Sequence, residues 1–163
     1  MSGGRPSSIK RIVLCAAASL HIYVPDFCLQ RGHIVYKALY RKWRPLTFDD
    51  VISQQHITDT LKNQLKNDKT AHAYLFMGSR GTGKTTCARI LAKAVNCPNM
   101  KDGSPCLECD ICREAEEGSL TDIIEIDAAS NNSVEDIREL RDGAVYTPER
   151  CRYKIYILSL IHI

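Results

Sequence analysis

The chain of 163 residues lacks an excess of either charge once its first segment is set aside. It holds 22 Lys and Arg against 19 Asp and Glu; residues 1–34 contain four of the basic residues and one acidic residue, which leaves 18 of each in residues 35–163. Neutralising a nucleic-acid backbone requires a clear surplus of Lys and Arg on one face. The neutral balance of residues 35–163 excludes a domain whose whole surface is basic and binds nucleic acid by charge. It is compatible with a local basic patch.

The sequence also lacks a long apolar run, an internal repeat and a low-complexity tract. Its only candidate for an export or membrane element runs from Ile12 to Val24 after two basic residues. That stretch has the length of a signal-peptide apolar region and is shorter than the roughly 20 residues that cross a bilayer as a helix. Residues 1–34 share no periodicity with the rest of the chain, so we expect a foreign leader followed by one globular domain in residues 35–163.

Helical periodicity appears in three places after residue 35. Ile57, Leu61 and Leu65 repeat every fourth residue, which predicts a helix that begins at the N-cap Ser53 and ends near residues 67–68. A second helix is predicted over 84–95, and a third over 133–141 with Ser133 as its cap. The inner face of the second helix is expected to consist of Ala88, Leu91, Ala92 and Val95.

Three short apolar runs are typical of strands, at residues 73–77, 122–126 and 153–157. The first is a continuous apolar run of the kind found in strands that are buried on both faces. Residues 96–112 are rich in Cys, Pro, Gly and Asp, which predicts a loop. Strands that alternate with helices indicate an α/β fold, in which a parallel sheet is covered by helices on both faces.

The segment between the first strand and the second helix matches the pattern G-x-x-x-x-G-K-[ST] in full. Its backbone N–H groups and the helix N-terminus would hold phosphate oxygens, Lys84 would reach the β- and γ-phosphates, and the Thr85 hydroxyl would ligate Mg²⁺. A glycine-rich turn with no ligand is the alternative, and the complete pattern in its strand-to-helix context disfavours it. The candidate phosphate-binding residues are Gly78, Ser79, Arg80, Gly81, Thr82, Gly83, Lys84, Thr85 and Thr86.

Four of the eight cysteines have metal-ligand spacing, C-x8-C-x2-C-x2-C. They are Cys97, Cys106, Cys109 and Cys112. Four thiolates with no open position describe a structural Zn²⁺ site, to which no catalysis is assigned. An iron–sulfur cluster also takes four cysteines, and a set of free or disulfide-bonded cysteines is the remaining alternative. The sequence favours zinc, in an insertion at 97–112.

An aromatic and basic block occupies residues 36–44, directly before Pro45. Such a block can contact nucleic acid, although it more often lies on a solvated face. Its position just outside a nucleotide fold suggests a third use, in which it wraps the base and the ribose.

These features together resemble the gamma/tau family of bacterial DNA polymerase III, which is the AAA+ ATPase of the sliding-clamp loader. The resemblance rests on residues 36–45, the phosphate loop, the four cysteines, and the segments 125–130 and 134–138. It extends from about Val35 to Ile157, and the phosphate loop and the zinc insertion in this order are more specific than either motif alone.

The resemblance implies an AAA+ fold that binds ATP, Mg²⁺ and Zn²⁺ in the cytoplasm, without a membrane. In the family, ATP binding drives the loader to open the clamp and place it on primed DNA, and hydrolysis releases it. The implied partners are the other clamp-loader subunits, the clamp and DNA, within the DNA-directed DNA polymerase holoenzyme. Residues implied near the adenine are Tyr40, Arg44, Pro45, Val51 and Ile52.

The chain departs from the family at its N-terminal side. Family chains begin at the equivalent of Val35, and valine is what an alternative GTG start codon encodes when it is translated internally. We therefore hypothesise that residues 1–34 come from a wrongly chosen upstream start. N-terminal sequencing of the natural product tests this, and a mature chain that retains residues before Val35 would contradict it.

A second departure follows Leu158, where the family has the Asp-Glu pair that holds Mg²⁺ and polarises the attacking water. Ser159 and Leu160 stand there instead, and the sensor residues, arginine finger, lid and collar of the family are absent. We expect a truncated domain that binds nucleotide weakly at best and does not turn it over. The alternative is a nonhydrolytic, zinc-stabilised nucleotide-binding interaction module; a small P-loop kinase is disfavoured because no substrate lid is visible.

The missing covering elements also predict open apolar strand surface at Ile155 and Ile157, and with it poor solubility.

Overall fold

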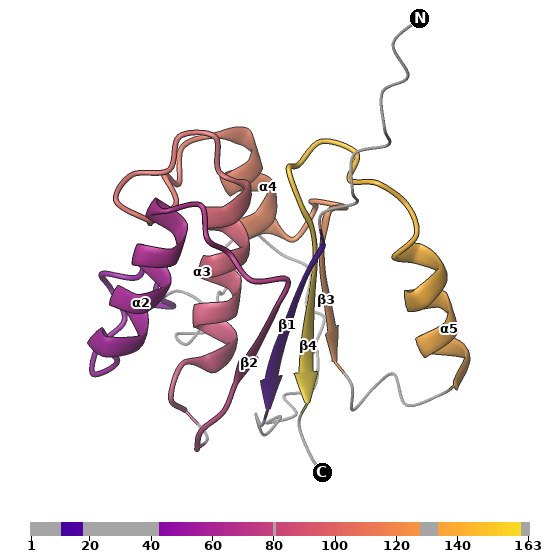
Figure 1. Ribbon diagram of the computed structural model, residues 1–163, viewed down its shortest axis with the longest axis horizontal. Helices are drawn as coiled ribbons and strands as arrows, with labels where there is room; N and C mark the ends of the chain where they lie inside the picture. The colour runs from indigo at the N-terminus through magenta and orange to yellow at the C-terminus, as the bar shows by residue number, and fades with distance from the viewer. Residues whose placement is uncertain (1–10, 18–42, 80, 128–133, 161–163) are drawn as a thin grey trace, which may run out of the picture.

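The computed structural model describes residues 11–17, 43–79, 81–127 and 134–160. Four parallel strands form one sheet in the order β2-β1-β4-β3, so the predicted mixed α/β fold with a parallel sheet is confirmed (Figure 1). The strands are β1 (Arg11–Ala17), β2 (Ala73–Phe76), β3 (Ile123–Asp127) and β4 (Lys154–Leu160).

Helices cover the two faces of this sheet. Figure 1 shows α2, α3 and α4 on one side of the sheet and α5 on the other. On the side of α2, α3 and α4, helix α3 packs directly against β1 and β4. The helices are α2 (Gln55–Lys66), α3 (Lys84–Asn96), α4 (Asp110–Glu117) and α5 (Val134–Gly143).

The core lies between α3 and the sheet. The predicted inner face of α3 is confirmed, because Ala88, Leu91, Ala92 and Val95 are all buried. Leu61 and Leu65 of α2 join the same cluster, whereas Ile57, the first residue of the predicted stripe, is partly exposed. Full burial of one such leucine contributes about 2 kcal/mol, so this cluster is the main source of stability.

Two expectations about the strands are wrong. Strand β2 pairs with β1 alone among the described strands, and its Leu75 is 65% exposed, so it is an edge strand with one open face and is not buried on both faces. Ile155 and Ile157 are buried, at 0% and 1% exposure. They are covered because β1 pairs with β4 along its full length and α3 lies over both strands.

Two expectations about the helices also need correction. Helix α2 begins after Gln54 and not after Ser53, whose φ of 67° belongs to a turn. Helix α4 lies partly within the segment predicted as a loop, since its N-cap is Cys109. The predicted cap Ser133 lies outside the described residues. In the part of the chain that the structure describes, no helix is both long and apolar enough to cross a membrane.

Candidate functional site

The motif segment 78–85, called the phosphate loop below after its predicted role, connects the end of β2 to the start of α3, as the motif predicts. Gly81 and Gly83 have φ values of 82° and 81°, a region in which glycine is free of the Cβ clash. Gly83 is the N-cap of α3 and supplies no side chain, and the first turn of α3 contains no acidic residue. The N-terminus of α3 therefore presents N–H groups and a positive dipole end, which favour an anion.

Lys84 is folded back over this loop. Its side chain is largely buried, and its Nζ donates to the carbonyl oxygens of Gly78 at 3.0 Å and Ser79 at 2.6 Å. The Thr82 hydroxyl donates to the same Ser79 carbonyl at 2.8 Å. A third contact runs from Nζ to the Thr82 hydroxyl oxygen at 3.4 Å, so the ammonium group is tied to the loop that precedes α3. Thr85 and Thr86 are half-buried in the first turn of α3, and Arg80 lies outside the described residues.

The residues expected near adenine do not share one environment. Val51 is buried in the core cluster with Phe48, whereas Ile52 is 86% exposed. Arg44 and Pro45 are half-buried, and Tyr40 lies outside the described residues. A contact between these residues and a base stays a prediction.

The carboxyl ends of the strands meet at the edge that carries the phosphate loop. Phe76 of β2, Ala16 of β1, Ser159 of β4 and Asp127 of β3 form one continuous row of Cα partners. Gly78 follows two residues after this row, so Ser159 stands at the level from which the phosphate loop begins. Asp127 belongs to the segment 125–130 on which the resemblance rests, but the sequence analysis assigns it no role at this edge, although the convergence of parallel strand ends could have indicated its position.

The four cysteines of the predicted insertion converge. Their sulfur atoms all lie within 4.8 Å of one another, and the Sγ atoms of Cys97 and Cys109 are 4.0 Å apart. Tetrahedral zinc with Zn–S bonds of about 2.3 Å separates its sulfurs by about 3.8 Å. The donor set and its spacing therefore fit a closed four-thiolate metal site.

Backbone N–H groups orient these sulfurs. Cys106 donates to the Cys97 sulfur, Cys109 to the Cys106 sulfur and Cys112 to the Cys109 sulfur, each at 3.4 Å. Burial raises the pKa of Cys106, but N–H groups of Cys109 and Glu108 outweigh it and lower this pKa to about 6. Burial raises the pKa of Cys97 and of Cys112. A divalent cation would compensate the charge of the deprotonated sulfurs in this buried site.

The cysteine cluster lies between the C-terminal end of α3 and the N-terminal end of α4. Lys93 of α3, which is 4% exposed, contacts Glu116 of α4 at 2.7 Å and ties the two helices together. Because α3 rises 1.5 Å per residue, the cluster is about 18 Å from Lys84 at the other end of the helix. That distance removes the cysteines from any reaction at the phosphate loop and supports a structural role.

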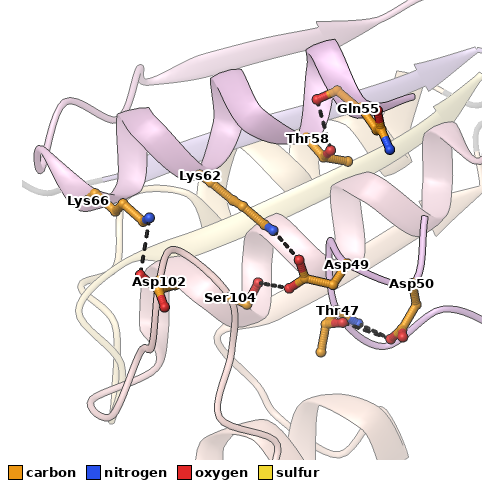
Figure 2. A network of polar contacts seen from close by, with 9 residues as sticks. All are labelled: Thr47, Asp49, Asp50, Gln55, Thr58, Lys62, Lys66, Asp102 and Ser104. Atoms are coloured by element: carbon orange, nitrogen blue, oxygen red, sulfur yellow. Dashed lines mark hydrogen bonds and ion pairs between the residues drawn. The ribbon is translucent and has the colours of Figure 1, made fainter. Parts of the chain in front are cut away.

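Figure 2 shows how the loop between Cys97 and Cys106 is fastened to α2. Lys62 of α2 pairs with Asp49 and lowers its pKa, and the Ser104 hydroxyl donates to the same carboxylate at 3.4 Å. Lys66 pairs with Asp102 at 3.2 Å. These polar contacts hold residues 101–104 against one face of α2.

Asp122 is a buried positioning residue that the sequence analysis missed. Its carboxylate accepts 2.9 Å hydrogen bonds from the backbone N–H groups of Glu149, Arg150 and Cys151 and so orders the turn that leads into β4. Burial raises its pKa, and these three hydrogen bonds outweigh burial, so the net pKa is lowered. The sequence gives no local signal for this role, because the partners are 27 to 29 residues away.

Comparison with known proteins was consistent with the motifs. The family model described as "DNA polymerase III, delta subunit" matches residues 53–162. DNA polymerase III subunit tau of Bacillus subtilis (strain 168) is 52% identical over 128 residues, which is 78% of this chain and 23% of that protein.

Two further relatives agree. DNA polymerase III subunit tau of Escherichia coli (strain K12) is 50% identical over 78% of this chain and 20% of its own length. DNA polymerase III subunit gamma of Buchnera aphidicola subsp. Baizongia pistaciae is 48% identical over 78% of this chain and 35% of its own length. The chain therefore spans between a fifth and about a third of these relatives. It belongs to the family of DNA polymerase III subunits that this model describes, and the similarity to gamma/tau that its motifs predict is confirmed.

Proposed function

We propose that this chain is a nucleotide-binding segment of a clamp-loader subunit, in which the loop from Gly78 to Thr85 holds the phosphates of ATP. The observation that carries the proposal is the position of Lys84, whose ammonium group is held inside the loop at the open N-terminus of α3. The Thr85 hydroxyl is the candidate ligand for Mg²⁺. The similarity to gamma and tau subunits of DNA polymerase III supports the same conclusion.

The proposal includes binding without turnover by this chain. At the β4 position of the row formed by Phe76, Ala16, Ser159 and Asp127, the residue is Ser159 and not a carboxylate. A hydroxyl neither neutralises Mg²⁺ nor polarises water as a carboxylate does. This observation favours the nonhydrolytic alternative for the chain as it stands, while the ATPase activity of the family requires the acids that Ser159 and Leu160 replace.

Titration of the full chain with a fluorescent ATP analogue in the presence of Mg²⁺ tests the phosphate site. We expect Lys84→Met to weaken binding at least tenfold, because the ammonium would make charge-assisted hydrogen bonds to the phosphates. Lys66→Met is the matched control, since Lys66 is the last residue of α2 and pairs with the exposed carboxylate of Asp102, away from the phosphate loop. Equal affinity of wild type and Lys84→Met would overturn the phosphate site, and phosphate release by the wild type above that of Lys84→Met would overturn binding without turnover.

We further propose that Cys97, Cys106, Cys109 and Cys112 hold one Zn²⁺ that stabilises the junction between α3 and α4. The convergence of four sulfurs within 4.8 Å supports this assignment. Elemental analysis of the purified full chain should give one zinc per chain, reduced to less than half by Cys109→Ser. Cys87→Ser is the control, because Cys87 is a buried helix residue outside the cluster. Iron in place of zinc would contradict the identity of the proposed metal. A purified chain with no bound metal would contradict the proposed metal site.

The proposed setting is the cytoplasmic DNA polymerase III assembly, with the other clamp-loader subunits, the sliding clamp and primed DNA as partners. The similarity to DNA polymerase III subunits supports it, and the resemblance to the clamp-loader family implies that DNA contacts are made collectively by an assembly, with which the neutral body of this chain is compatible. Co-expression of the chain with the loader subunits of its own organism, followed by affinity purification, tests this setting. Recovery of the chain without those subunits would contradict it.

A further inference from the structure

The first segment of the chain forms a central strand of the sheet. All seven residues of β1 have Cα partners in β4, and four of them have partners in β2 on the other side. Among the described residues, β2 pairs with no strand except β1. The strand that carries the phosphate loop is therefore joined to the rest of the sheet through Arg11–Ala17.

The composition and burial of this segment suit a central parallel strand. The sequence of β1 is RIVLCAA, which contains neither Pro nor Gly and has one charged residue at its start. Central parallel strands are typically such continuous apolar runs. Leu14 is 0% exposed and belongs to the core cluster that includes Ile157 of β4 and Leu91 of α3.

The position of β1 determines where the phosphate loop can stand. Neighbouring strands are about 4.8 Å apart, so β1 separates β2 from β4 by about 9.6 Å. Ala16 is the partner of both Phe76 and Ser159, and Gly78 follows Phe76 by two residues. Loss of β1 would leave β2 with no strand to pair with in the described sheet, and the loop would lose its fixed relation to β4.

We propose that Arg11–Ala17 is a positioning strand for the phosphate loop, inserted between β2 and β4 and required to hold the loop at the sheet edge. The pairing of β1 with β2 and β4 follows from the sheet topology alone. The expected effect of β1 on nucleotide affinity rests on the proposed function above. This role assigns residues 11–17 to the folded domain, whatever the origin of the first segment.

Hydrogen exchange of backbone amides in the full chain, measured without nucleotide, tests the pairing. Leu14→Asp places a charge in the core beneath β1 and should expel the strand. We expect amides of residues 73–76 and 154–160 to exchange at least tenfold faster than in the wild type, while those of α4 keep their rates. Leu14→Ile is the control and should keep the wild-type exchange rates, because it keeps the volume and apolar character of the side chain.

If Leu14→Asp unfolds the whole chain, a less disruptive variant tests the same pairing. Leu14→Ala is then compared with Leu61→Ala, which removes an equally buried leucine from α2. We expect faster exchange in β2 with Leu14→Ala only, and weakening of ATP-analogue affinity by at least fivefold with Leu14→Ala only. Equal exchange of β2 in the two variants would overturn the positioning strand. Faster exchange without loss of affinity would retain the strand and overturn its link to the phosphate loop, whereas a wild type that binds no nucleotide would overturn the proposed function alone.

Discussion

At the scale of single residues, alanine substitutions at two glycines allow the destabilisation caused by backbone strain to be compared with that caused by a steric clash. Gly103 and Gly118 have φ values of 77° and 75°, so an alanine is strained at both positions. A Cβ at Gly103 would lie 2.8 Å from Cα and from the carbonyl oxygen of Lys62, whereas a Cβ at Gly118 meets nothing within 4 Å. The difference arises because residues 101–104 are fastened against α2.

We therefore predict that Gly103→Ala lowers the free energy of unfolding by about 1–3 kcal/mol more than Gly118→Ala does. The backbone of α2 cannot give way without disturbing its packing on α3. Urea unfolding of the two variants and the wild type, followed by circular dichroism, measures the difference. Equal losses of the free energy of unfolding in the two variants would show that residues 101–104 can move away from α2 without destabilising the fold.

A second prediction at this scale concerns Asp122 and acid stability. Its pKa is lowered in the folded chain by the N–H groups of Glu149, Arg150 and Cys151. A carboxyl group with a lowered folded pKa adds stability above its unfolded pKa of about 3.9, and this stability is lost as the pH falls through the folded value. Asp122→Asn should therefore lower the free energy of unfolding at pH 7 by about 2 kcal/mol and show a weaker loss on acidification than the wild type.

Urea unfolding at pH 7 and at pH 3 measures both effects of Asp122→Asn. Glu117→Gln is the control, because Glu117 is an exposed carboxyl group on α4. If Asp122→Asn and Glu117→Gln lose stability with falling pH to the same extent, the three hydrogen bonds to Asp122 do not account for the acid sensitivity.

At the scale of elements, the ion pair between the buried Lys93 and the more exposed Glu116 determines how firmly α3 holds α4. Glu116→Ala leaves the buried Lys93 ammonium without its carboxylate, which should cost about 2 kcal/mol. The double variant Lys93→Met with Glu116→Ala removes the charge as well and should recover at least half of that loss. Thermal unfolding measures these changes in stability, with Glu117→Ala on α4 as the control. A double variant less stable than Glu116→Ala would contradict the role given to the Lys93–Glu116 ion pair.

The elements that were predicted correctly are those whose pattern is local. Helix α3 and strand β4 follow from apolar patterns within their own residues, and the glycine-rich turn between β2 and α3 follows from its local sequence, while phosphate binding by that turn stays a prediction. Helix α4 was missed because it has eight residues and begins among the cysteines. Strand β1 lies in the segment that we expect to be a foreign leader, and its pairing could not be predicted because its partners, β2 and β4, lie far away in the sequence.

The same distinction holds for the sites. The spacing of the cysteines predicted a cluster that the structure brings together, because the ligands lie within one turn and the end of one helix. The roles of Asp122 and Lys93 could not be predicted, since each depends on a partner at least 23 residues away. The covering of Ile155 by β1 and α3 was missed for the same reason.

At the scale of the whole molecule, α3 joins two sites that we expect to be energetically separable. Gly83 of the phosphate loop precedes its first residue and Cys97 follows its last, about 21 Å apart at 1.5 Å per residue. Chelation of the metal should lower the melting temperature of the full chain by about 10 °C, because binding to the folded state alone stabilises it.

The same treatment should leave the affinity for the ATP analogue within about twofold at 10 °C, where the chain stays folded, because the coupling between two sites is limited to their differential contacts. Binding measured on chelated and zinc-reconstituted protein at that temperature checks this separation. A more than tenfold loss of affinity, with α3 still protected from hydrogen exchange, would mean that α3 transmits the state of the cysteine cluster to the phosphate loop, and the cluster would then regulate the nucleotide site.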